Sequence, residues 1–198
     1  NMELKLPTPE QLETVYEADL KVSFPAAELK PLRIIQKMVE DGYYRPWCLF
    51  DGKEIVGECF LWLGAPGWAL LDYLCVSPRF RNGGVGARML AEMLAAEPDT
   101  VILGESEVPE YAPDPDMARR RLGFYARNHA RLAGYDTEMF GVPYKTLYWA
   151  DAPIPDQQLI DAHRAIYLSR FSPDKYARYI RIPREPDAEP MPRVDWNE

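Results

Sequence analysis

The sequence predicts an α/β fold: a mixed, mostly antiparallel central sheet with helices on both faces and a helical appendage at the C-terminal end. Apolar runs bounded by turn residues follow one another between residues 47 and 76, as expected for antiparallel strands joined by tight turns. A glycine-rich loop and an amphipathic helix then lead into another apolar run near residue 101, which indicates a parallel crossover. Two apolar runs between residues 132 and 149 complete the pattern.

The N-terminal region, up to about residue 42, has the pattern of two helical segments. Thr8-Pro9-Glu10 supplies an N-cap, a proline at the first helical position and an acidic first turn. A second helical periodicity runs from about Ala26 to Glu40, and Pro31 should break or kink it, so that regular helix begins only there. The strands that follow are expected at Trp47–Phe50, Ile55–Leu63 and Trp68–Val76, with a hairpin turn at Asp51-Gly52 between the first two.

The second half of the chain alternates helices and strands and ends in an appendage. Helices are expected at Ala87–Ala96 and from Asp114 to about Asn128, with strands at Thr100–Gly104 (extended by Glu105-Ser106-Glu107), Leu132–Phe140 and Tyr144–Trp149. We expect residues 1–151 to form one domain and residues 152–198 to form a helical appendage and tail packed on it, with a helix at Asp156–Leu168. The tail beyond Pro183 is proline-rich and acidic, and we expect it to pack weakly.

Composition and charge limit the classes of function. Hydrophobic residues make up 47% of the 198 residues and charged residues 27%, as in ordinary globular proteins. The net charge of -8 argues against nucleic acid as a partner, and a membrane partner is not expected because no apolar run approaches the roughly 20 residues that span a bilayer. Cys48, Cys59 and Cys75 each lie inside an apolar run, which predicts reduced, buried thiols in a cytoplasmic protein. No cysteine–histidine cluster has metal-ligand spacing, so we expect no metal site.

The loop between Arg79 and Gly86 carries the strongest chemical signal in the sequence. Its glycines follow a buried strand and open a helix, so backbone N–H groups and the positive end of the helix dipole could surround an anion. A P-loop would require Gly-Lys-Ser/Thr, but Gly86 is followed by Ala87-Arg88. A dinucleotide-binding fingerprint would require glycine or alanine where Met89 stands. What remains is a pyrophosphate cradle of another kind, or a glycine-rich turn without a ligand.

Arg81-x-x-Gly84-x-Gly86, after a strand that ends Val76-x-Pro78, resembles the acetyl-CoA signature of the GCN5-related N-acetyltransferase (GNAT) family, Gln/Arg-x-x-Gly-x-Gly/Ala. The resemblance extends over about residues 24 to 150, and the sequence is similar to a group of bacterial members whose substrates are mostly unassigned. It implies the GNAT fold, acetyl-CoA as co-substrate, and transfer of an acetyl group to an amine.

The resemblance also implies which residues bind acetyl-CoA. Leu74, Cys75 and Val76 would pair through their backbone with the pantetheine arm, which takes the place of a missing strand. In the family's fourth helix a glycine is replaced by His129, at a position that we expect to have a positive φ. Ala118 replaces an asparagine of the family, so one polar contact to the pantetheine arm is not expected. The pyrophosphate would lie against Arg81, Asn82, Gly83, Gly84, Val85, Gly86 and Ala87.

Three residues are candidates for acid–base chemistry. Tyr125 resembles the family's general acid, which protonates the departing CoA thiolate, although plain core packing would also fit its position. Glu105 and Glu107 lie two apart on an expected strand and so share one face, where a carboxylate could deprotonate an acceptor ammonium. The alternative for this pair is a solvent-exposed strand end.

The sequence does not identify the acceptor. Glu28 lies in the region that lines the acceptor site in the family, where it could meet a cationic group or belong to a helix linker. We expect acetyl transfer to a primary amine, of a small molecule or a peptide, by direct attack in a ternary complex. The alternatives are a non-catalytic acyl-CoA-binding or regulatory module with the same fold, and an enzyme for a larger acyl group or an alcohol acceptor. Whether the protein forms a homodimer is left open.

Overall fold

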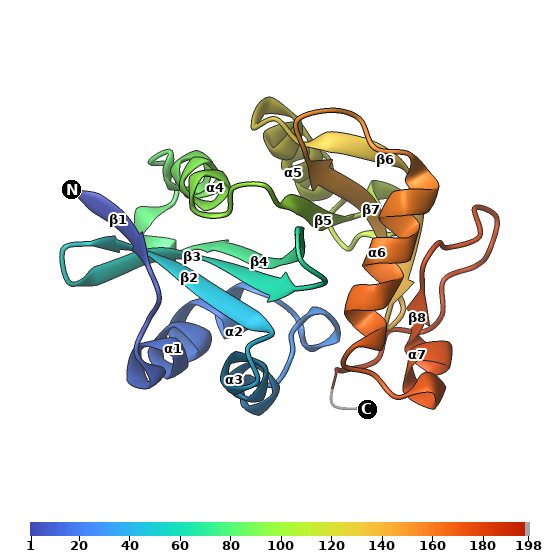
Figure 1. Ribbon diagram of the computed structural model, residues 1–198, viewed down its shortest axis with the longest axis horizontal. Helices are drawn as coiled ribbons and strands as arrows, with labels where there is room; N and C mark the ends of the chain where they lie inside the picture. The colour runs from blue at the N-terminus through green and yellow to red at the C-terminus, as the bar shows by residue number, and fades with distance from the viewer. Residues whose placement is uncertain (197–198) are drawn as a thin grey trace.

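The computed structural model describes residues 1–196, which form one sheet with helices packed on both faces (Figure 1). The sheet has eight strands in the order β1-β2-β3-β4-β5-β7-β6-β8. β4 and β5 run parallel and each other neighbouring pair is antiparallel, which confirms the predicted mixed sheet. The strands are β1 (Met2–Lys5), β2 (Tyr44–Asp51), β3 (Glu54–Leu63), β4 (Trp68–Val76), β5 (Val101–Glu107), β6 (Arg131–Met139), β7 (Val142–Trp149) and β8 (Ile180–Arg181).

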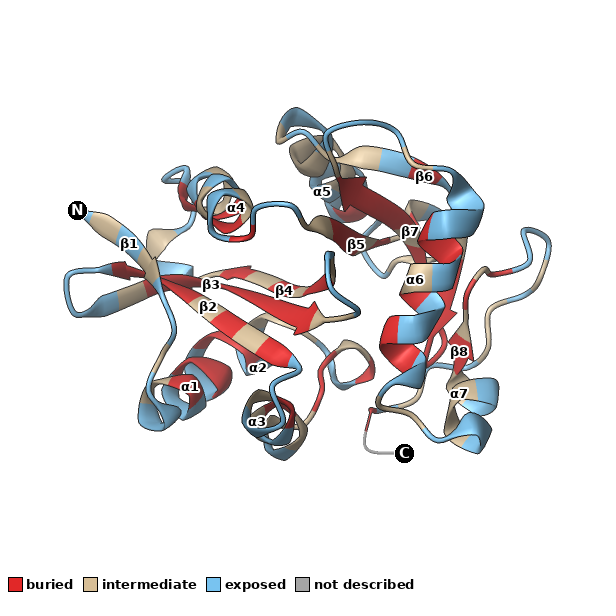
Figure 2. Ribbon diagram, viewed as in Figure 1, coloured by how far each residue is buried: buried red, intermediate tan, exposed pale blue. Residues whose placement is uncertain are grey.

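The helices divide between two faces of the sheet. On one, the α6 face, buried side chains of α1, α3 and α6 share a single apolar core. On the other, the α4 face, α4 buries its own apolar side and α5 packs beside it. Figure 2 shows that most strands are buried along much of their length, whereas the longer helices bury only part of their surface. The helices are α1 (Pro9–Val15), α2 (Lys21–Ser23), α3 (Leu32–Glu40), α4 (Val85–Ala96), α5 (Pro115–Arg127), α6 (Asp156–Leu168) and α7 (Pro173–Tyr179).

The N-terminal helices begin where the sequence predicts. The Thr8 side chain accepts a hydrogen bond from the Gln11 N–H, and the Gln11 side chain accepts one from the Thr8 N–H, so α1 begins with a capping box. Pro31 directly precedes α3, which confirms that regular helix begins only there. Between the two helices, residues 26–28 form a single 3₁₀ turn. β1 is an addition that the sequence does not predict, because a four-residue edge strand is too short to show a clear periodicity.

The prediction that the tail packs weakly is wrong. Trp196 is only 7% exposed, and its ring stacks on Phe140 with centroids 4.3 Å apart. Arg184 is also buried, and its guanidinium pairs with the Glu138 carboxylate at 3.1 Å. A single large aromatic side chain can anchor a segment that is otherwise polar and rich in proline, and composition alone does not reveal such an anchor.

Cys48, Cys59 and Cys75 are buried free thiols, as their apolar surroundings predict. Within residues 1–196, every helix is too short or too polar to cross a membrane. The same residues contain no group of three or more histidine, cysteine, aspartate or glutamate side chains arranged to hold a metal ion.

Candidate active site

β4 and β5 pair over only part of their length. Their parallel ladder joins Trp68–Leu71 to Val101–Gly104 and then stops. Beyond it, β4 follows β3 as far as Val76 and β5 follows β7 as far as Glu107, so the two strands diverge. The backbone groups of residues 72–76 that face β5 therefore lack a strand partner. An extended ligand can form backbone hydrogen bonds with those groups, as a neighbouring strand would. Leu74, Cys75 and Val76 lie in this unpaired part.

A β-bulge in β4 marks the start of the divergence. The β3 residues opposite Leu71 and Tyr73 are direct neighbours in sequence, so Asp72 is an extra residue in the ladder. Successive side chains normally alternate between faces, yet Asp72 and Tyr73 both contact Lys30 on the α6 face. The bulge thus places the Asp72 carboxylate and the Tyr73 phenol on the same face of the sheet.

The glycine-rich loop has the backbone shape that an anion cradle needs. Gly84 caps α4 with a φ of 74°, and Asn82 also has a positive φ, of 70°. A residue with a Cβ would be strained at Gly84, which explains the glycine there. Because α4 begins at Val85, the N–H groups of Val85, Gly86 and Ala87 have no acceptor inside the helix. They can therefore bind an anion, which the helix dipole also favours.

The remaining cradle residues lie at the surface beside these N–H groups. Arg81, Asn82 and Gly83 are exposed, and the Arg81 guanidinium donates a hydrogen bond to Ser23 Oγ at 3.1 Å. A side chain added at Gly86 would come within 3.1 Å of the Phe124 ring, so the glycine allows the start of α4 to approach α5 closely. The predicted cradle residues are thus adjacent in space as well as in sequence.

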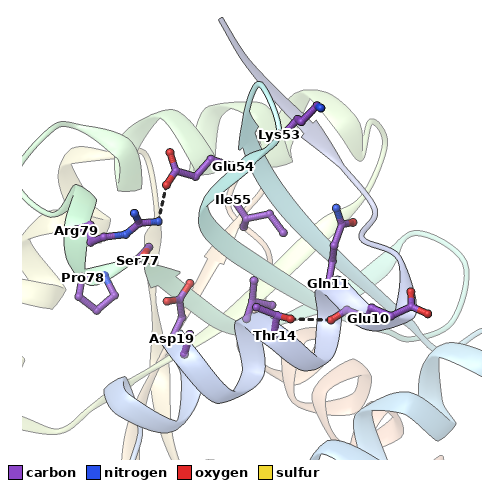
Figure 3. A pocket seen from close by; sticks show the side chains of 12 residues that line it. Glu10, Gln11, Thr14, Asp19, Lys53, Glu54, Ile55, Ser77, Pro78 and Arg79 are labelled. Carbon is purple, nitrogen blue, oxygen red and sulfur yellow. Dashed lines mark hydrogen bonds and ion pairs between the residues drawn. The ribbon is translucent and has the colours of Figure 1, made fainter.

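A cavity of about 470 Å³ opens beside the entrance to this loop (Figure 3). Ser77, Pro78 and Arg79 line one side of it, and α1 lines the other. An ion pair between Arg79 and Glu54 connects the loop to the β2–β3 hairpin. Residues 81–87 and 74–76 do not line the cavity, so it lies outside the contacts that the sequence predicts for the cofactor.

Glu105 and Glu107 are engaged by the C-terminal part of the chain rather than by solvent. The His163 Nε2 lies 2.8 Å from Glu105 Oε2, and the Tyr167 hydroxyl donates to the same oxygen at 2.8 Å. The Arg193 guanidinium pairs with Glu107 Oε1 at 3.1 Å. The Glu105 and Glu107 side chains are only 13% and 10% exposed, which argues against the alternative of a solvent-exposed strand end.

Glu28 joins these carboxylates from the 3₁₀ turn before α3. Burial raises the pKa of Glu28 to about 7, and the negative charge of Glu107 adds to the effect. Arg193 and a hydrogen bond from the Tyr144 hydroxyl, 3.3 Å from Glu28 Oε1, act in the opposite direction. Glu28 is therefore a carboxyl group that titrates near neutral pH.

A buried ion pair holds the segment of Glu28 against β4. Lys30 is 2% exposed, and its Nζ lies 2.9 Å from both carboxylate oxygens of Asp72. The Tyr44 hydroxyl donates to Asp72 as well, at 2.5 Å. Burial raises the pKa of Asp72, and the Lys30 ammonium opposes that shift. Glu28, Asp72, Glu105 and Glu107 are called the carboxylate cluster below.

Tyr125 lies on the α4 face, opposite the carboxylate cluster. Its ring packs edge-on against Trp149, with centroids 5.8 Å apart. Burial raises the pKa of Tyr125 to about 12, with a weaker opposing effect of Arg121, so the phenol is protonated at neutral pH. His129, four residues on, has a φ of 74°, as predicted. Tyr125 on the α4 face and Glu105 on the α6 face thus lie on opposite sides of the sheet in which β4 and β5 diverge.

Several residues that contact the cluster are not recognised from the sequence, among them His163, Tyr167 and Arg193. His163 and Tyr167 look like part of the apolar side of α6, and Arg193 looks like a surface charge in the tail. One signal is present, because a histidine on an apolar helix side must have a hydrogen-bond partner once it is buried. Cys75 is not suited to act as a covalent nucleophile. Burial raises the pKa of its thiol to about 12, which makes a reactive thiolate scarce at neutral pH.

Comparisons with known proteins agree with this geometry. The model of the acetyltransferase (GNAT) family matches residues 10–124, and no protein of curated function matches the sequence. A GNAT-family protein from Bacteroides thetaiotaomicron has 20% identity and a TM-score of 0.69, covering 85% of this chain and 97% of that chain. The Escherichia coli ribosomal-protein-S18-alanine N-acetyltransferase has 10% identity and a TM-score of 0.59, covering 78% and 96%. A Bacillus subtilis acetyltransferase in complex with CoA has 13% identity and a TM-score of 0.53, covering 77% and 99%.

Proposed function

The chain belongs to the GNAT acetyltransferase family, and we propose that it transfers the acetyl group of acetyl-CoA to a primary amine by direct attack in a ternary complex. Enzymes of this family use acetyl-CoA as the acetyl donor. The observation that carries the proposal is the divergence of β4 and β5, with Tyr125 on one face and Glu105 on the other. A thioester in that opening would meet an acid from one side and a base from the other.

The acetyl-CoA site of this proposal joins the divergence to the cradle. The pantetheine arm lies along the unpaired backbone of Leu74, Cys75 and Val76, in the position of a missing strand. The pyrophosphate lies on the free N–H groups at the start of α4. The loop residues that surround it are Arg81, Asn82, Gly83, Gly84, Val85, Gly86 and Ala87.

The reaction needs one proton removed and one supplied. An amine reaches the site mostly as ammonium, and Glu105 accepts its proton. The neutral nitrogen attacks the thioester carbonyl carbon, which forms the C–N bond. When the C–S bond breaks, the leaving CoA sulfur takes the proton of Tyr125, which the raised pKa of about 12 keeps in place until then.

The carboxylate cluster supports a cationic acceptor. Glu28 and Glu107 add negative charge beside Glu105, and opposite charge attracts an ammonium ion. The similar Escherichia coli enzyme acts on the alanine amine of a ribosomal protein, which is consistent with a peptide acceptor, and a small-molecule amine fits the same chemistry.

One observation favours the alternative of a non-catalytic acyl-CoA-binding module. Residues of the tail occupy part of the same face: Arg193 pairs with Glu107, and the Trp196 ring lies 4.2 Å from Lys30 Nζ. Release of free thiol from acetyl-CoA with a panel of small amines and peptides separates the two functions. Amine-dependent release supports the enzyme, whereas CoA binding without release with any amine supports the module.

Glu105→Gln tests the base. We expect it to lower kcat/KM for the amine about 100-fold near pH 7, and the deficit to shrink as pH rises because the acceptor is then already neutral. Steady-state kinetics between pH 6 and about pH 10 would show this. A deficit that is equal at every pH would indicate that Glu105 only positions the acceptor.

A further inference from the structure

We infer that α6 is part of the active site, and that His163 and Tyr167 are positioning residues that hold the Glu105 carboxylate in place. The inference rests on the proposed role of Glu105 as the base. α6 lies outside residues 10–124, the segment that the family model matches, so membership of the family assigns no role to either residue.

The hydrogen-bond pattern shows which atom donates to Glu105. A carboxylate that is to act as a base has no proton to give, so in this proposal His163 Nε2, 2.8 Å from Glu105 Oε2, carries the hydrogen. In the neutral ring Nδ1 is then an acceptor, and the Tyr135 hydroxyl lies 3.0 Å away to donate to it. Tyr135 is thus compatible with the tautomer in which His163 is a donor to Glu105.

The two oxygens of Glu105 are not equivalent. Oε2 is contacted by both His163 and Tyr167 at 2.8 Å, whereas Oε1 has only the Tyr167 hydroxyl at 3.1 Å. Among the residues that the structure describes, Oε1 therefore keeps more lone-pair capacity and is the oxygen suited to take the acceptor's proton. Two fixed donors on Oε2 hold the carboxylate in one orientation, which proton transfer to a positioned base requires.

α6 is a firm support for these donors. His163 and Tyr167 are four residues apart on the helix and so project from the same side. The Tyr167 ring packs on Trp62 of β3 with centroids 4.8 Å apart, and Leu159 and Ile166 anchor the helix in the core. His163 is completely buried, so bulk water does not compete with Glu105 for its ring N–H.

The test compares single and double variants in acetyl transfer to the best amine of the panel. We expect His163→Leu to lower kcat/KM for the amine about 10- to 100-fold near pH 7 while the Kd for CoA is unchanged, and this deficit should shrink as pH rises. In a Glu105→Gln background the same substitution should cause no further loss. Tyr167→Phe should show the same pattern with a smaller loss.

Two controls separate positioning from general packing. His163→Gln supplies an N–H donor in place of Nε2 and should recover part of the rate lost in His163→Leu. Ile166→Val removes a methylene from the core side of α6 without touching Glu105, so it should lower Tm and leave kcat/KM within about twofold. Circular dichroism and Tm of every variant establish that each is folded.

The outcomes distinguish this inference from the proposed function. If Glu105→Gln is impaired but the His163 and Tyr167 variants are not, or if the losses multiply in the double variant, the positioning role is overturned and the proposed function stands. If Glu105→Gln has no deficit at any pH, the base assignment fails and the positioning role falls with it. Should His163→Leu not fold, His163→Gln and Tyr167→Phe carry the same comparison.

Discussion

The cradle loop and the carboxylate cluster are built in opposite ways. The cradle consists of consecutive residues and offers backbone N–H groups, whose directions depend on the positive φ of Gly84. The cluster consists of side chains from distant parts of the chain, each held by a partner such as Lys30 or His163. Backbone recognition tolerates many side-chain changes but not a change of φ, whereas a buried side-chain network fails when a single partner is lost.

Removing one partner in the cluster should have the largest effect. Lys30→Met leaves the buried Asp72 carboxylate without its cation, and we expect a loss of about 3 to 5 kcal/mol in the free energy of unfolding, measured in urea. Asp72→Asn in the same protein should restore part of it. The Kd for CoA should stay unchanged under conditions where the variant is folded. A matching loss of CoA affinity would show that the two regions are not independent.

Tyr125, on the α4 face, should affect turnover but not affinity. We expect Tyr125→Phe to lower kcat about 100-fold, because the leaving sulfur loses its proton donor, while the Kd for CoA is retained. Because the pKa of Tyr125 is raised to about 12, wild-type turnover should show no alkaline loss from this group below about pH 11. Unchanged turnover of an acyl donor with a poor leaving group would remove the acid role.

Gly84→Val should break the cradle and spare the cluster. A branched residue is strained at a φ of 74°, so the loop must rearrange, and we expect CoA to bind at least about 10-fold more weakly by calorimetry. Gly42→Val is the matched control, because Gly42 has a φ of 81° in open space far along the chain from the cradle. It should lose similar stability and keep its CoA affinity. Equal affinity losses in both variants would mean that strain alone is responsible.

The effect of Glu28→Gln on stability should depend on pH. The pKa of Glu28 is raised from its ordinary value of 4.5 to about 7, so its contribution to stability is present below pH 4.5 and is lost as pH rises through 7. We therefore expect the variant to gain up to about 3 kcal/mol relative to wild type at pH 8, and less than about 1 kcal/mol at pH 5. A pH-independent difference in urea unfolding would contradict the titration of Glu28.

The same contrast explains what could be predicted from the sequence. The cradle is local: Gly84, Gly86 and the start of α4 follow from spacing and from the conformational freedom of glycine, and the positive φ of His129 follows from the family's glycine. The mixed sheet could also be predicted, because apolar runs and the turn residues between them mark its strands. The role of each cradle residue toward CoA stays a prediction.

The cluster could be predicted only in part. The two-residue spacing of Glu105 and Glu107 indicates a shared face, but their partners lie 58 and 86 residues away in sequence. No periodicity specifies that α6 lies over β5, so His163 reads as a core residue until the fold brings it to Glu105. The packing of the tail could not be predicted for a similar reason, since the position of Trp196 depends on Phe140, far from it in the chain.

The divergence of β4 and β5 has a mechanical consequence. Four residue pairs are the whole of the ladder that joins the β1–β4 half of the sheet to the β5–β8 half, and Figure 1 shows the two halves opening away from that junction. Few backbone hydrogen bonds therefore join the two halves, and side-chain packing such as that of Tyr167 on Trp62 supplies the rest of the junction. A ligand that bonds to the free edge of β4 would add backbone hydrogen bonds beside this junction, so we expect its binding to stabilise the whole sheet against unfolding.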